Sequence, residues 1–184
     1  MGTLISAVDI KRLWYTNTES ITGDLTPTML KSVLAGATEV LNVHQDTWTI
    51  EETEATQDSY KNQLTGQTYR MGAKTMGDVT YNWTIGQYDY ETKADLMGGT
   101  ASDGMWKRER GAVDKYKTII ALTEDDQYAV LPKANIAARQ AQTDGAVGLA
   151  VVATALEPDN AEVAPEYWIA KSKVDKPEPE PDAA

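Results

Sequence analysis

The sequence predicts a mainly β domain with one short helix, and two observations carry this prediction. A segment in which apolar and polar residues alternate, Val79–Ile85, is followed by a helical segment that begins after Asp89 and ends at Gly98. Three later apolar runs have the length and composition of strands, at residues 116–122, 128–131 and 145–156. No catalytic constellation accompanies these elements, which indicates a role in assembly rather than in chemistry.

The first 24 residues combine a short apolar stretch at 4–10 with a Thr-, Asn- and Gly-rich stretch at 16–24. This composition predicts an N-terminal arm or edge strand that leads into a loop. Trp14 and Tyr15 lie between the two stretches, and large side chains of this kind are costly to leave in water. We therefore expect both to pack on a surface, which either the same chain or a second copy supplies.

A helix is predicted to begin at Pro27, because Thr26 is a good N-cap and proline is favoured at the first helical position. Apolar residues at helical spacing follow, and Gly36 is well placed to end the helix. The segment is short, so an extended conformation stays open as an alternative. The pattern then becomes β-like, with an apolar run at 40–43 and alternation around Trp48 and Ile50.

Residues 51–66 form a long polar stretch in which Tyr60 and Leu64 are the only large apolar side chains. Unstructured segments longer than about 12–15 residues are uncommon in compact domains and are usually functional or mobile. The sequence therefore predicts a long polar loop here. Composition alone leaves two interpretations, a loop used in assembly or a solvated excursion.

The helix at about residues 89–97 is predicted from its N-cap, Asp89, and from an apolar stripe formed by Tyr90, Ala94 and Met97. The strand predicted at 145–156 differs from the others because both of its faces are apolar. Such a strand is typical of a sheet centre buried on both sides, or of a sheet with one face covered by a neighbouring subunit.

We predict one domain over residues 1–170 and a flexible tail rich in Pro and Glu over residues 171–184. Alternating proline and acidic residues near the C-terminus favour an extended, solvated chain. The formal net charge of −11 makes tight binding to nucleic acid or to anionic lipid unfavourable. The longest apolar run, at 146–156, is short for the roughly 20 residues of a membrane span.

The sequence nominates no catalytic, cofactor-binding or metal-binding residue, and we expect neither enzyme activity nor a cofactor. Cysteine is absent, which excludes disulfides and zinc–thiolate sites. The single histidine, His44, follows a predicted strand and has no serine or cysteine partner that the sequence can identify. Adjacent carboxylates such as Asp125 and Asp126 point to opposite faces of an extended chain, so they form no acid–base pair.

The order of these elements resembles the major tail tube proteins of long-tailed bacteriophages, over roughly residues 37–156. Three stretches carry the resemblance: the strand and glycine-terminated helix at 79–99, the strand–turn–strand at 118–136, and the apolar strand at 148–156. The resemblance implies a β-sandwich or barrel-like fold with one short flanking helix. It further implies hexameric rings that stack into a hollow tube, through which DNA passes without specific binding along an electronegative lumen.

The resemblance also implies where contacts between subunits lie. The polar stretch would reach a neighbouring ring or subunit, and its candidate residues are Glu51, Glu52, Glu54, Asp58, Tyr60, Lys61 and Leu64. An N-terminal arm would fasten subunits together through Leu4, Ile5, Trp14 and Tyr15. The implied partners are further copies of the chain, a tape-measure protein, and tail terminator and tip proteins. The implied location is the virion tail, assembled in the bacterial cytoplasm without a membrane.

Two other functions remain as alternatives. The first is a surface or fimbrial β domain used in adhesion, although the N-terminus does not resemble a secretory signal because its basic residues follow the apolar stretch. The second is a carbohydrate-binding β-sandwich in which Trp48, Trp83 or Trp106 would stack on sugar rings. Other virion structural proteins, such as a tail terminator or a capsid decoration protein, would share the same pattern.

Overall fold

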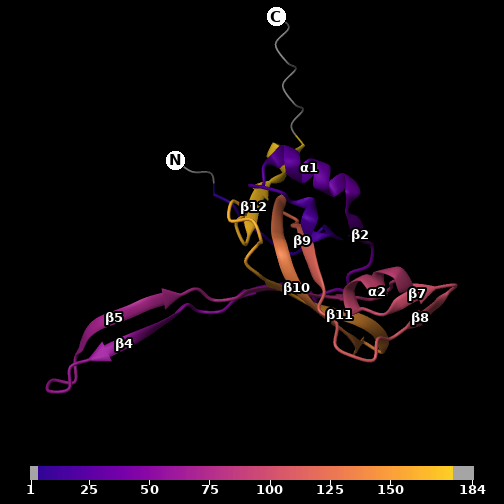
Figure 1. The fold of residues 1–184 in the computed structure, drawn as a ribbon. Helices are drawn as coiled ribbons and strands as arrows, with labels where there is room; N and C mark the ends of the chain where they lie inside the picture. Colours follow the sequence, from indigo (N-terminus) through magenta and orange to yellow (C-terminus); the bar gives the residue numbers. More distant parts are fainter. Residues whose placement is uncertain (1–3, 176–184) are drawn as a thin grey trace, which may run out of the picture.

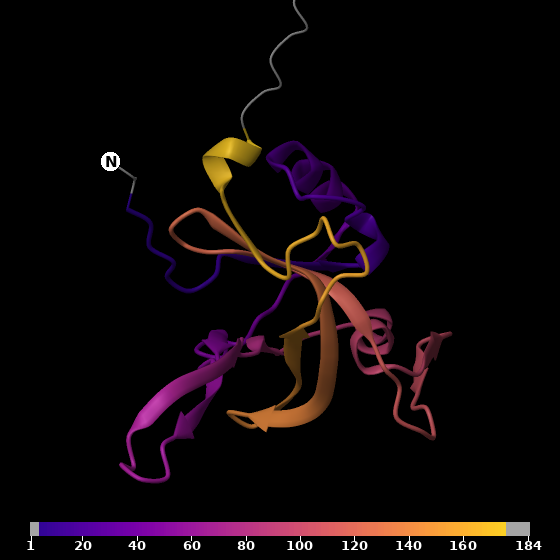
Figure 2. The same ribbon diagram turned by 60° about the vertical axis from the view of Figure 1, so that its left-hand side comes forward.

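The computed structural model describes residues 4–175 and confirms a mainly β fold. Its largest element is an antiparallel sheet of eight strands, bent into two halves that face each other (Figures 1 and 2). A layer of helices covers the outer side of one half, and a long two-stranded arm projects from the other half (Figure 1). The predicted sandwich-like architecture is therefore present.

The first half of the sheet is covered on both faces. It contains β2 (Thr38–Val40), β1 (Arg12–Thr16), β9 (Tyr116–Leu122), the beginning of β10 (Gln127–Thr143) and β12 (Tyr167–Ala170). The side chains of β9 show the consequence, because the five residues from Thr118 to Leu122 are all buried. The predicted turn after this strand is present at 123–126, where the Thr123 carbonyl accepts a hydrogen bond from the Asp126 amide.

The second half contains the end of β10, then β11 (Ala146–Ala155), β6 (Val79–Ile85) and β3 (Thr49–Glu52). Strand β10 reaches both halves because it is 17 residues long, and its pairing with β9 shifts register between Leu131 and Ala134. Pro132 lies at this bulge, where a residue without an amide hydrogen is tolerated. The predicted run at 128–131 was thus only the beginning of a much longer strand.

The main core lies between the two halves. Leu13, Tyr15 and Ile119 contribute from the first half, and Tyr81, Trp83 and Leu149 contribute from the second. The alternation predicted for Val79–Ile85 is confirmed, since Tyr81, Trp83 and Ile85 point into this core. An isolated bridge between Val43 and Ile85 brings the segment after β2 back to β6, which gives the sandwich a partly closed, barrel-like outline.

A second apolar cluster joins the first half of the sheet to the helical layer. Helix α1 (Pro27–Gly36) begins as predicted, because the Thr26 hydroxyl accepts a hydrogen bond from the Met29 amide. Its Leu30 and Val33 pack with Trp14 and Val130, beside the 3₁₀ turn η1 (Thr18–Ser20).

The predicted boundary of the C-terminal tail was placed too early. Residues 171–174 form a short helix, α3 (Lys171–Val174), and the Val174 side chain is buried in the second cluster beside α1. An apolar side chain that can be buried there favours a helix over a solvated tail. The Pro- and Glu-rich residues 176–184 lie outside the described residues.

Helix α2 (Tyr90–Met97) has the predicted N-cap, with the Asp89 carboxylate accepting from the Thr92 amide. Its predicted apolar stripe is only partly right, because Met97 packs against the main core but Tyr90 is exposed, and the fully buried residues are Lys93 and Leu96. The Lys93 ammonium lies 4.1 Å from the ring centroid of Trp106, on the short hairpin of β7 (Thr100–Ser102) and β8 (Met105–Lys107). This cation–π contact stabilises the Lys93 ammonium group in its buried position.

The prediction of a loop at 51–66 was also wrong. Its first residues belong to β3, and the others form β4 (Thr56–Lys61) and the turn to β5 (Thr68–Thr75). Together β4 and β5 form the projecting arm of Figure 1. None of the helices among residues 4–175 has both the length and the apolar character that a membrane crossing requires.

Candidate functional site

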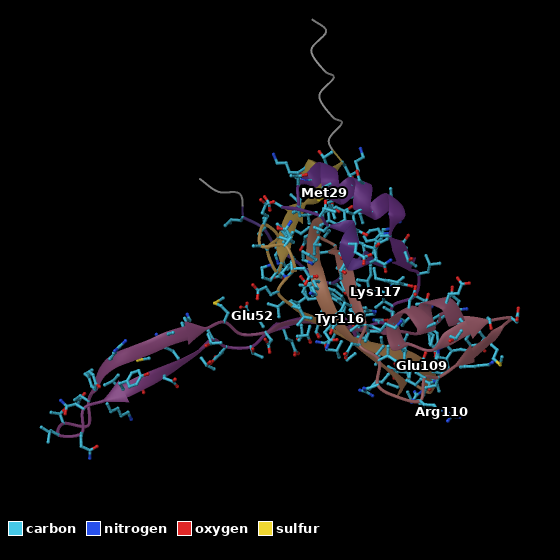
Figure 3. All side chains as sticks on the ribbon, in the orientation of Figure 1. Met29, Glu52, Glu109, Arg110, Tyr116 and Lys117 are labelled. Carbon is cyan, nitrogen blue, oxygen red and sulfur yellow. The ribbon has the colours of Figure 1, made fainter. Side chains whose placement is uncertain are left out.

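The arm is the most exposed part of the described chain. Every residue of β4 and β5 is exposed except Gly72, and the two strands form a sheet of their own. Figure 3 shows the side chains of the arm surrounded by no other segment, and it labels Glu52 close to the point where the arm leaves the body. The arm is therefore a surface built entirely for solvent or for another molecule.

The root of the arm is fixed by two hydrogen bonds between residues 53 and 78. The Thr53 amide donates to the Asp78 carbonyl at 3.0 Å, and the Asp78 amide donates to the Thr53 hydroxyl at 2.8 Å. Gly77 allows this approach, because a Cβ at that position would lie 1.7 Å from the Thr53 carbonyl oxygen. Glycine at 77 thus sets the direction in which the arm leaves the sheet.

The tip of the arm is a turn organised by Asn62. The Asn62 amide donates to the Gln67 carbonyl, and the Asn62 carbonyl accepts from the Gly66 amide, both at 2.8 Å. The Asn62 side chain accepts from the Leu64 amide, also at 2.8 Å, and Gly66 has a φ of +70° that favours glycine. This ordered turn leaves the Leu64 side chain 94% exposed.

Large apolar side chains lie along the arm, and no other segment of residues 4–175 covers them. They are Tyr60, Leu64, Tyr69, Met71 and Met76, each between 48% and 94% exposed. Near the tip, the Arg70 guanidinium lies 5.8 Å from the ring centroid of Tyr60 across the two strands. Tyr60 and Arg70 are paired and lie on one face of the hairpin, whereas Tyr69 and Met71 lie on the other, so both faces of the arm expose apolar side chains.

The arm and the remaining chain carry opposite charge. Residues 56–75 contain three cations, Lys61, Arg70 and Lys74, and one acid, Asp58, which gives +2. The total of −11 therefore leaves −13 on the remaining sequence. Within residues 4–175, no arm cation lies within ion-pair distance of a carboxylate.

The predicted residues of the polar stretch are divided between the arm and its root. Glu51 and Glu52 lie on β3, Glu54 lies in the connection, and the others lie on the arm: Asp58, Tyr60, Lys61 and Leu64. The sequence does predict a strand at residues 67–71, which is part of β5, but the candidate residues left out its Tyr69, Arg70 and Met71, which are equally exposed. The signal was available, since Thr65-Gly66 separates two strand-like runs and such a pattern is typical of a hairpin.

The N-terminal candidates separate into two pairs. Leu4 and Ile5 are exposed, on a segment that runs beside the turn after β9, where the Glu124 amide donates to the Val8 carbonyl. Trp14 and Tyr15 do not belong to an exposed arm, as the prediction required, because β1 lies between β2 and β9. Both are buried within their own chain, which is the first of the two alternatives stated above.

The two buried aromatic residues of β1 have separate environments. Trp14 faces the helical layer beside Tyr128, with the Arg12 guanidinium 4.7 Å from its ring. Tyr15 faces the main core and donates its hydroxyl to Asp95 at 3.2 Å. Burial raises the pKa of Tyr15 to about 12, since the apolar surroundings disfavour its anion.

No cluster of three or more His, Asp or Glu side chains is arranged to bind a metal ion anywhere in residues 4–175. His44 lies 2.9 Å from the Asp144 carboxylate and ties the β10–β11 turn to the segment after β2. Of the tryptophans considered as sugar platforms, Trp83 is buried in the core, and Trp106 contacts Lys93 and donates to the Gly98 carbonyl.

One hollow on the body combines apolar and acidic groups near the root of the arm. Ile50 lies on β3 and Trp48 lies just before it, whereas Trp168 lies on β12. The acids that line the hollow are Asp9 and Asp46. Trp48 also packs on Tyr81 and Trp83, with ring centroids 5.5 and 6.1 Å away. Ala7 of the N-terminal segment completes one side of the hollow.

A scan against models of known protein families finds no match to this chain, and a search of curated proteins likewise finds no significant match.

Proposed function

We propose that this chain is a structural subunit that assembles with copies of itself, through its arm, into stacked hexameric rings that form the hollow tail tube of a bacteriophage. One observation carries the proposal: the arm exposes apolar side chains along its whole length and leaves the body that it belongs to (Figure 1). The ring number and the tube come from the resemblance to tail tube proteins, whereas the contact between copies comes from the arm.

The exposed arm should be more stable when another surface covers it than when it stands free in water. An isolated two-stranded hairpin is marginally stable in water, so β4 and β5 gain stability when a further surface covers them. Full burial of a side chain such as Leu64 or Met71 contributes about 1.5–3 kcal/mol. A surface with several such residues is therefore suited to a lasting contact rather than to a transient one.

The charge asymmetry favours a second copy as the partner. Residues 56–75 have a net charge of +2, and the remaining sequence has a net charge of −13, so the two attract each other. Every copy of the chain provides both the positive segment and the negative surface. The arm and its binding surface are different parts of the chain, so the contact is head to tail. Head-to-tail contacts close into rings or continue as filaments.

The open face of the second half-sheet suits the wall of a channel for DNA. On β3, β6, β10 and β11 this face carries small or uncharged side chains such as Thr80, Asn82 and Val152, with Glu51 and Arg139 as its charged residues. A face with a single cation neutralises few phosphates, so DNA would slide along it without binding tightly. The apolar residues on both faces of β11 agree with one face being covered or enclosed only in an assembly.

An armless variant tests the proposal. Thr53 and Asp78 are already hydrogen-bonded to each other, so residues 54–77 can be replaced by Asn-Gly, the preferred two-residue hairpin turn. We expect the full chain to form rings or hollow tubes in negative-stain electron microscopy, and the armless chain to stay monomeric with unchanged thermal unfolding of its body.

Mixing the two chains provides the control. An armless copy keeps the surface that binds an arm but cannot bind the next copy, so it should shorten assemblies when added in small amounts. A full chain that stays monomeric at every concentration, even with an initiating tail-tip complex, would exclude the tube. Unaltered tubes from the armless chain would exclude the arm as the contact.

A further inference from the structure

We propose that the hollow lined by Trp48, Ile50 and Trp168 is the binding site for the arm tip of a second copy. This inference rests on the proposed self-assembly and identifies the surface that completes it. The tip has one apolar side chain, Leu64, with cations on the strands beside it, and the lining of the hollow combines apolar side chains with two acids, Asp9 and Asp46. The two surfaces are therefore complementary in both polarity and charge.

The apolar part of the match joins a rigidly held leucine to partly exposed aromatic side chains. Leu64 is almost fully exposed at a turn that hydrogen bonds hold in one shape, so it can enter a hollow without ordering a flexible loop. Trp168 is 39% exposed, and Trp48 and Ile50 are partly exposed beside it. Rigid aromatic side chains in a hollow are the usual anchors of protein interfaces.

The electrostatic part of the match uses groups that have no ionic partner within the described residues. Asp9 and Asp46 lie at the hollow, and neither makes an ion pair among residues 4–175. Lys61 and Arg70 are the cations next to the tip. Docking would place positive and negative groups together at the edge of an apolar contact, where such pairs set orientation and association rate.

The arm cannot reach the hollow of its own chain. Fourteen residues separate Ile50 in the hollow from Leu64 at the tip, which corresponds to on the order of 40 Å of extended strand. Figures 1 and 2 show the arm directed away from the body along this whole length. The occupant is therefore a second copy, and hollows joined by one arm lie on the order of 40 Å apart.

The same contact would use the exposed N-terminal residues. Ala7 lines the hollow, and Leu4, Ile5 and Val8 on the same segment are exposed beside it. The segment is held to the body by the Glu124 amide, which donates to the Val8 carbonyl, and by the Ser6 hydroxyl, which donates to Asp125. The arm of one copy and the N-terminal segment of the next thus form two sides of one interface.

Disulfide trapping tests this assignment, because the chain contains no cysteine. The double variant Ala7→Cys, Gln63→Cys places one thiol at the hollow and one at the tip, and keeps Leu64. Disulfides require Cα atoms within about 7 Å, so no bond can form inside one chain. Mild oxidation during assembly should therefore give a ladder of covalent oligomers on a non-reducing gel.

The matched control is Ser102→Cys, Gln63→Cys. Ser102 lies on the β7–β8 hairpin, on the side of the body opposite to the arm (Figure 1). A ladder from this control and none from the Ala7 variant would overturn the assignment and move the receiving surface to β7–β8. Normal tubes with no ladder from either variant would overturn the hollow but leave the proposed function intact. A chain that never assembles would overturn both.

Charge reversal gives an independent readout. The double variant Lys61→Glu, Arg70→Glu should weaken assembly at least tenfold in critical concentration, and Asp9→Lys, Asp46→Lys on the same chain should restore it. If the second pair of changes fails to restore assembly while the body unfolds as in the wild type, the charged edge of the hollow is not the partner of the arm. These surface changes leave the core untouched, so folding can be checked separately.

Discussion

The body and the arm of this chain are stabilised in opposite ways. In the body, the two halves of the sheet bury residues such as Tyr81, Ile119 and Leu149 completely, and a helical layer covers one outer face. In the arm, the strands pair with each other and leave almost every side chain in solvent. The body therefore accounts for folding, whereas the arm provides the exposed surface on which the proposed assembly depends.

This difference teaches how apolar residues should be interpreted in this chain. Trp14 in the body and Tyr60 in the arm both lie on strands, yet the first is buried by its own chain and the second is 48% exposed. Truncating an apolar residue of the body should change the free energy of unfolding. Truncating one in the arm should change only the association of subunits.

The largest expected effect is on the body. Trp83→Ala removes a ring that is 2% exposed and that packs beside Trp48, so it should lower the free energy of unfolding by about 3–5 kcal/mol. Leu64→Ala in the arm should change it by less than about 0.5 kcal/mol. Urea denaturation of monomeric protein measures both, and equal losses from the two variants would remove the distinction between body and arm.

Alkaline pH should also affect the body selectively. The folded-state pKa of Tyr15 is raised to about 12 by burial, above the ordinary value of about 10, so its contribution is complete below pH 10 and is lost as the pH rises toward 12. The lost contribution is on the order of 2–3 kcal/mol. Tyr15→Phe should lose less stability between pH 10 and pH 12 than the wild type.

Tyr60→Phe on the arm is the control for this measurement, because its ring lies outside the core. Urea midpoints measured at pH 8, 10 and 12 should separate the Tyr15 variant from the wild type and leave the Tyr60 variant unchanged. Identical alkaline profiles for all three chains would show that Tyr15 does not contribute.

The arm should be sensitive to a change at its root. Gly77→Ala would place a Cβ 1.7 Å from the Thr53 carbonyl oxygen, so the arm must leave the sheet in another direction. We expect assembly to weaken at least tenfold, which is about 1.4 kcal/mol, while the urea midpoint of the body stays close to the wild-type value.

Gly36→Ala is the matched control for this variant. It adds the same methyl group at the end of α1, where nothing lies within 4 Å. Light scattering against protein concentration measures assembly in both variants. If Gly77→Ala assembles as well as Gly36→Ala, the direction of the arm does not matter for the contact.

The body was predictable from sequence wherever local patterns and burial agree. Alternation identified Val79–Ile85, and the capping residues Thr26 and Asp89 placed both principal helices. The prediction failed where tertiary contacts override local patterns. Lys93 is buried because its ammonium group makes a cation–π contact with Trp106, thirteen residues later. Val174 is buried because α1 lies beside it.

The arm was harder to predict because burial does not shape its sequence. An exposed hairpin needs no apolar alternation, so residues 51–66 resembled a loop although Asn62 and Gly66 supply the turn. The hollow was harder still, since it brings together Asp9, Trp48 and Trp168, which are far apart in the sequence. Only the return of β12 to β10 places Trp168 beside them.

The smallest expected effect concerns an ion pair in the body, between Arg12 and Glu39. The cations of the arm make no such pair within residues 4–175. Arg12 contacts both carboxylate oxygens of Glu39 at 2.7 Å and holds the pKa of Glu39 below its ordinary value. Because the folded-state pKa is lowered, the stabilisation is present above the ordinary glutamate pKa and is lost as pH falls through the lowered value. The pair is partly exposed, so Glu39→Gln should lower the free energy of unfolding at pH 7 by less than about 1 kcal/mol.

This ion pair also sharpens the comparison of the body with the arm. The difference between Glu39→Gln and the wild type should shrink as the pH falls through the lowered pKa of Glu39, and urea midpoints measured in steps from pH 7 into acid would follow it. Lys61→Gln in the arm should leave the unfolding of the monomer unchanged at either pH, because Lys61 has no carboxylate within ion-pair distance in residues 4–175. A loss of monomer stability from Lys61→Gln would mean that the arm contacts its own body in solution.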